Sequence, residues 1–82
     1  MADRTAAHYE LARALIRYEA GEVVEALGLA RGAATLVVDD ARLDFHIHAL
    51  ISAMERQQSR GMVSDSVARA YQAVLTELRR IT

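Results

Sequence analysis

The chain has 82 residues, a length typical of one small domain, which we expect to span residues 1–82. It contains no cysteine, so neither a disulfide nor a thiolate zinc site can stabilise it. The formal net charge of −1 disfavours nucleic acid or an anionic membrane as a generic partner, because both attract a strongly positive surface. A chain this short buries only about 60–65% of the surface that its unfolded form exposes. Self-association is therefore a simple further source of stability.

The first predicted helix covers residues 5–20. Its apolar residues recur at spacings of four, four and three, and so share one helical face: Ala7, Leu11, Leu15 and Tyr18. Asp3 or Thr5 can cap this helix, and Gly21 follows it where C-terminal glycines are found. Ile16 lies outside the main stripe, so its side chain is available for another contact.

The second predicted element covers residues 22–38. Its apolar residues share one stripe if the segment is a single helix: Val23, Leu27, Ala30, Ala34, Val37 and Val38. Gly28 and Gly32 interrupt the stripe, each at a cost near ~1 kcal/mol relative to alanine. The segment is therefore either one helix with a weak middle or two short helices that turn at Gly28. Leu29 and Leu36 lie outside the stripe.

The third predicted helix covers residues 40–59. Its apolar residues form one stripe: Leu43, Ile47, Leu50, Ile51 and Met54. This stripe differs from that of residues 22–38 by about half a turn around the helix axis, so one straight helix cannot place both on the same side. We place the break at Asp39 and Asp40, where either carboxylate can cap the new helix. Phe45 lies nearly opposite this stripe, among small residues that include Ala49. An aromatic side chain in such surroundings indicates a contact surface for another chain.

The fourth predicted helix covers residues 64–81, with Ser64 as its N-cap. It has an unbroken apolar stripe: Val67, Ala70, Tyr71, Val74, Leu75, Leu78 and Ile81. The sequence therefore predicts an all-α fold, a small bundle of about four helices. The bundle closes either within one chain or across a dimer.

The histidines do not predict a metal site. On a helix, His46 and His48 point about 200° apart and cannot share a metal ion. Asp44 and His48 share a face, but a third ligand is missing, so we interpret them as a local pair on a solvated surface. No catalytic motif or phosphate-binding loop is present either. We therefore expect no metal, no cofactor and no enzyme activity.

Residues 22–38 resemble a bacterial helix-turn-helix motif. The matching positions are a small residue in the first helix, two turn residues and two buried residues in the second helix: Ala26, Gly28, Leu29, Ala34 and Val37. The resemblance implies a DNA-binding regulator that uses residues 22–42, with Arg31, Thr35 and Arg42 as DNA contacts. Asp39 and Asp40 depart from the pattern, because they would meet the phosphates with the wrong sign.

The preferred interpretation rests on apolar residues outside the main stripes, the candidate interface residues Ile16, Leu29, Leu36, Phe45 and Ala49. They predict a non-enzymatic helical module, a small adaptor, regulator or inhibitor, which forms a homodimer and also binds another protein. The first residues contain no apolar run, and no stretch approaches the ~20 apolar residues that span a bilayer. We therefore expect a cytoplasmic protein with no membrane segment.

Overall fold

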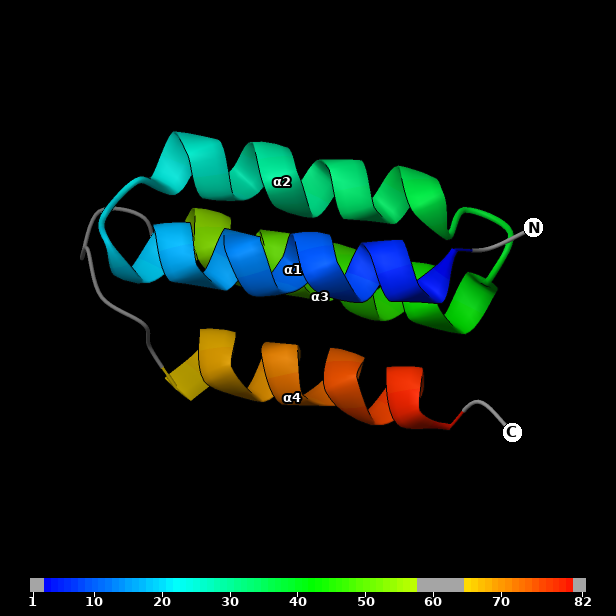
Figure 1. The fold of residues 1–82 in the computed structure, drawn as a ribbon. Coiled ribbons are helices and arrows are strands. Elements are labelled where there is room, and N and C mark those ends of the chain that lie inside the picture. Colours follow the sequence, from blue (N-terminus) through cyan, green and yellow to red (C-terminus); the bar gives the residue numbers. More distant parts are fainter. Residues whose placement is uncertain (1–2, 58–64, 81–82) are drawn as a thin grey trace.

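The computed structural model of the protein describes residues 3–57 and 65–80, and these form an all-α bundle. Its helices are α1 (Arg4–Glu19), α2 (Val23–Leu36), α3 (Ala41–Gln57) and α4 (Asp65–Arg79). They run nearly side by side and alternate in direction along the chain (Figure 1). The predicted fold is confirmed, and each described helix end lies within two residues of its predicted position. The predicted cap at Ser64 and the predicted helix ends at residues 59 and 81 lie outside the described residues.

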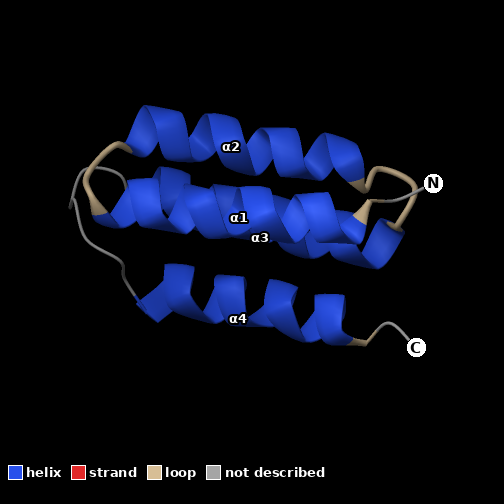
Figure 2. Ribbon diagram, in the orientation of Figure 1, coloured by secondary structure: helices blue, strands red, loops and turns tan. Residues whose placement is uncertain are grey.

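The helices associate as two hairpins. Packing is most extensive between α1 and α2 and between α3 and α4, while α2 on α3 joins the hairpins and α1 barely touches α4. In Figure 2, α1 lies in front of α3, with α2 and α4 on either side. Alanine supplies most of the buried side chains of α2, and α1 adds Ala7 and Ala14. Small side chains let two helix axes approach closely, which explains the extensive α1–α2 packing.

The core consists mostly of the apolar stripes that the sequence predicts. Its largest fully buried side chains come from all parts of the bundle: Leu11, Tyr18, Val37, Leu43, Ile47, Leu50, Met54, Val67 and Val74. Val38 is a correction: the predicted stripe of residues 22–38 includes it, but it is 73% exposed, because α2 ends at Leu36 and helical spacing no longer applies at residue 38. Among the described helices, none has the length and apolar content that a bilayer crossing requires.

The second element is one uninterrupted helix through both glycines. The turn that the helix-turn-helix resemblance implies at Gly28 is absent, so that interpretation of residues 22–42 is wrong in its geometry. The chain turns after α2, at residues 37–40, instead. The reason is packing: Leu27, Ala30 and Ala34 are buried on both sides of the glycines. Tertiary burial of one continuous face offsets the glycine cost.

Two side-chain caps and one glycine define the helix ends. The Asp3 Oδ1 atom accepts a hydrogen bond from the Ala6 amide at 2.9 Å, so Asp3 is the cap of α1. The Asp40 Oδ1 atom accepts one from the Leu43 amide at 3.2 Å and caps α3, as predicted. Gly21 has φ of 85° at the end of α1, a left-handed conformation that favours glycine.

Polar contacts join α1, α3 and α4 at one end of the bundle. The Arg4 guanidinium bonds the Asp40 carboxylate and donates to the Glu77 carbonyl oxygen at 3.2 Å. The Glu77 side chain is itself buried, with Arg42 Nε at 3.7 Å and Arg80 Nη1 at 3.8 Å from its carboxylate oxygens. Within this network, the Arg4 hydrogen bond to Glu77 joins α1 to α4, two helices that otherwise approach each other at few positions.

We expect Asp40→Ala to lower the free energy of unfolding by about 1–2 kcal/mol, because it removes both the α3 cap and the Arg4 contact. Urea unfolding followed by circular dichroism measures the change. Asp40→Asn is the matched control: asparagine caps as well as aspartate, so this variant loses only the charge of the Arg4 pair and less stability. Equal losses in the two variants would show that the cap contributes nothing.

Candidate functional site

Among the described residues, five large apolar side chains are exposed: Tyr9, Ile16, Val24, Val38 and Phe45. Single exposed apolar residues are common on soluble proteins and need no function. A group that lies next to a cavity is more informative. The positions of these five relative to the helices therefore decide which of them belong to a candidate site.

Phe45 lies on the outward face of α3, as the sequence predicts. Its side chain is 69% exposed, while Leu43 and Ile47 on the same helix are fully buried. The ring makes an edge contact with His46, with centroids 5.5 Å apart. Its exposed helical neighbours include the small residues Ala41 and Ala49 and the long or bulky residues Arg42 and His48.

The other predicted interface residues do not gather around Phe45. Ile16 is exposed as expected, but it lies on the outward side of α1. Leu29 and Leu36 are partly buried and pack against the core, which corrects the prediction that they lie outside it. A long side chain at the boundary of a stripe can reach back to the core, and helical spacing alone does not show this. Of the predicted set, only Ala49 shares the surface of Phe45.

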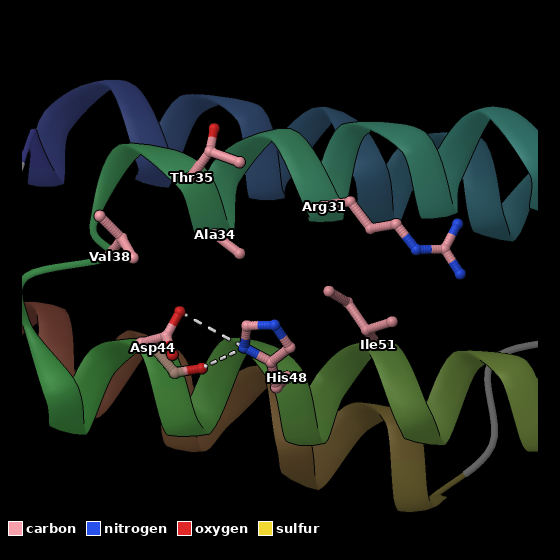
Figure 3. A pocket seen from close by; sticks show the side chains of 7 residues that line it. All are labelled: Arg31, Ala34, Thr35, Val38, Asp44, His48 and Ile51. Carbon is pink, nitrogen blue, oxygen red and sulfur yellow. Dashed lines mark hydrogen bonds and ion pairs between the residues drawn. The ribbon is translucent and has the colours of Figure 1, made fainter.

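A groove of about 400 Å³ lies between α2 and α3 (Figure 3). Its apolar part consists of Ala34, Val38 and Ile51. Val38 is 73% exposed, although it follows a fully buried residue, Val37. The groove is thus lined by one of the five exposed large apolar side chains.

Polar side chains bound the groove at both ends. At one end, Arg31 Nη2 of α2 donates to Glu55 Oε2 of α3 at 2.6 Å. At the other, His48 Nδ1 lies 2.9 Å from the Asp44 carbonyl oxygen and 3.4 Å from Asp44 Oδ1. A carbonyl oxygen only accepts, so in neutral His48 the proton is on Nδ1. The Nε2 atom, which points towards α2, is then an acceptor (Figure 3).

The predicted DNA contacts are engaged within the protein. Arg31 pairs with Glu55, and the Thr35 hydroxyl donates to the Gly32 carbonyl oxygen at 2.7 Å. Arg42 lies beside Glu77 at 3.7 Å. The structure brings Arg31 and Thr35 together along the groove, and their role as DNA contacts stays a prediction.

Asp44 and His48 form the local pair that the sequence predicts. Within residues 3–57 and 65–80, no three histidine or carboxylate side chains gather closely enough to hold a metal ion. The groove therefore combines an apolar part with charged side chains of both signs, Arg31 and Asp44.

The sequence did not reveal the groove, because it forms only where two helices meet. One signal was available: Val38 is the second of two adjacent valines, and adjacent residues on a helix point about 100° apart. They cannot both be fully buried on one narrow face. Comparison of the chain with protein-family models, curated proteins and solved structures gives no match.

Proposed function

We propose that the protein is a non-enzymatic helical module that acts by protein–protein contact and pairs with a second copy through the face formed by α2 and α3. The exposure of Phe45 on α3, one of the two helices that form an open apolar groove, is the observation that carries this proposal. Burying such a ring contributes roughly 1.5–3 kcal/mol relative to leaving it in water. Exposed apolar surface next to a cavity is typical of interaction sites.

The proposal extends to the setting in which the module acts. All ten basic residues are arginine, and alanine is abundant, a composition typical of proteins from GC-rich genomes. We propose a bacterial, cytoplasmic adaptor, regulator or inhibitor, which binds another protein in addition to its own copy. Arginine suits such contacts, because its planar guanidinium group forms paired hydrogen bonds at interfaces.

We expect light scattering of the full chain to show a dimer whose dissociation constant rises at least about tenfold in Phe45→Asp, since ~1.4 kcal/mol corresponds to a factor of ten. The reason is that the substitution would bury a charge in an apolar contact. Ile16→Asp is the matched control, because Ile16 is 63% exposed and lies on α1. It should leave the association unchanged. A strict monomer at high protein concentration would refute the proposed homodimer.

A further inference from the structure

We infer that the bundle opens along the seam between α1 and α4, and that Arg4 is the clasp that holds this seam closed. The other three packed pairs of helices are consecutive in the chain, whereas α1 and α4 are not. The opening is a motion within one chain, and it is independent of the proposed homodimer. Three features indicate it: the sparse packing of the seam, a hollow at one end of it and the contacts of Arg4.

The α1–α4 seam is packed less closely than the other seams of the bundle. The pairs α1–α2, α3–α4 and α2–α3 each approach closely at more positions than α1 and α4 do. The two helices of the seam run in opposite directions, so the start of α1 lies beside the end of α4 (Figure 1). Sparse packing contributes little burial, and regions with few packed contacts open before the rest of a protein does.

A hollow of about 140 Å³ lies at this end of the seam. It is lined by Arg4, Thr5 and His8 of α1 and by Leu78 of α4. Thr5 and His8 are exposed, so the hollow is open to water. A gap between two helices removes contacts between the side chains on its two walls. Apolar contact therefore contributes little at this end, and another interaction has to hold α1 against α4.

The seam is also incompletely covered further along the two helices. Leu15 lies seven residues after His8, and Tyr71 lies seven residues before Leu78. Seven residues are almost two full turns, so Leu15 and Tyr71 lie on the same helix faces as these two residues of the hollow. Both side chains pack against the core but are only partly buried. Water therefore reaches the seam at two levels that are two helical turns apart.

Arg4 connects α1 to both helices of the other hairpin. Its guanidinium bonds the Asp40 carboxylate at the start of α3 and donates to the Glu77 carbonyl oxygen of α4 at 3.2 Å. Carbonyl groups in the last turn of a helix lack partners within the helix, and the helix dipole favours a cation there. The Arg4 side chain is only partly exposed, so solvent screens these contacts less than those of a surface ion pair. Arg4 thus closes the seam at the end where the hollow weakens it.

The absence of cysteine from the chain allows a direct test, because an introduced cysteine is then the only thiol. A buried thiol reacts with a labelling reagent only when its surroundings open, so its labelling rate measures the opening. Leu78→Cys places a thiol in the α4 wall of the hollow, and Leu11→Cys places one on the α1 face that carries Arg4. Both leucines are buried. Ala30→Cys is the control, because Ala30 is fully buried on α2, which packs on α1 and α3.

The clasp is tested by measuring each thiol in three backgrounds: the wild-type chain, Arg4→Met and Arg13→Met. Methionine keeps an unbranched apolar side chain and removes the guanidinium. Arg13→Met is the matched control, because Arg13 lies on the same helix and bonds Glu10 of α1. Urea unfolding of every variant gives its global unfolding constant, and the labelling rates are compared after correction for that constant.

In the wild-type background, we expect Leu78→Cys and Leu11→Cys to be labelled at least about tenfold faster than global unfolding allows. Ala30→Cys should be labelled only at the rate of global unfolding. Arg4→Met should accelerate the labelling of the first two thiols by a further factor of about ten or more, because hydrogen bonds of a charged group are lost. Arg13→Met should leave all three corrected rates unchanged.

Two results would overturn the inference. If all three thiols are labelled at the rate of global unfolding, the bundle opens only as a whole. If Arg4→Met accelerates labelling at Leu78→Cys alone, the end of α4 frays and the seam stays closed. Should Leu11→Cys fail to fold, Leu15→Cys replaces it on the same face of α1, and its labelling must accelerate in Arg4→Met by the same factor.

Discussion

Replacing Gly28 and Gly32 together by alanine is expected to raise the free energy of unfolding by about 2 kcal/mol. Both glycines lie inside α2, neither has a positive φ, and outside the neighbouring backbone of α2 no atom lies within 4 Å of the position that a Cβ would take. Alanine therefore gains helix propensity without a clash. For a domain of this size the change corresponds to a rise in Tm of roughly 8–16 °C, which differential scanning calorimetry measures.

Gly21 provides the control of opposite sign. Its φ of 85° strains any residue with a Cβ, although the space around it is open. Gly21→Ala should therefore lower the free energy of unfolding by about 1 kcal/mol. The double alanine variant could instead be less stable than the wild type, by an amount that depends on protein concentration. That result would mean that a helix of a second copy packs directly on Gly28 and Gly32.

The helices could be predicted from the sequence because each one has its own apolar stripe and a chemical signal at an end. The phase change near Asp39 and Asp40 located the break between α2 and α3, and Asp40 is the cap. The sequence leaves two alternatives for α2, because one continuous helix and a helix-turn-helix share the local pattern around Gly28. Packing against α1 and α3 decides in favour of a continuous helix, and packing is not encoded in local propensity.

The candidate site could be predicted only in part. Helical spacing correctly placed Phe45 outside the core, because it lies far from the centre of the α3 stripe. The same reasoning failed for Leu29 and Leu36, which lie at the boundary of the α2 stripe and reach the core edge. Spacing gives a direction around the helix axis, whereas burial depends on where the neighbouring helices lie.

The groove between α2 and α3 could not be predicted from the sequence. It brings together Arg31 and Glu55, which are 24 residues apart in the chain. Nothing in either local pattern indicates that these residues meet, because the register between α2 and α3 follows from the packing of the whole bundle. The residues of a helix can be assigned to faces from the sequence, but the spaces between helices cannot.

The protein is expected to lose stability steeply as the pH rises above about 10. Burial raises the pKa of Tyr18 and of Tyr71 above the ordinary value of 10.0. Above the unfolded pKa, the unfolded chain releases these protons while the folded chain keeps them, so unfolding becomes easier. The stability is complete below this pKa and falls by about 1.4 kcal/mol per pH unit for each tyrosine, until the folded pKa is reached.

Tyr18→Phe tests the contribution of Tyr18 to this effect. The Tyr18 hydroxyl is buried and has no hydrogen-bond partner among the described residues, so its removal should leave stability at neutral pH equal or higher. Urea unfolding at several pH values should show a shallower alkaline decline in Tyr18→Phe, and shallower still with Tyr71→Phe added. Tyr9→Phe, at an exposed site, serves as the control and should match the wild type.

The amino-acid composition leaves few other side chains that titrate in this pH range. The chain contains no lysine and no cysteine, and arginine remains charged well beyond the range of the experiment. Tyrosine is therefore the only side-chain type that titrates near pH 10, and the three tyrosines can be removed one at a time. An alkaline decline that persists when Tyr18 and Tyr71 are both phenylalanine would contradict the assignment to buried phenols.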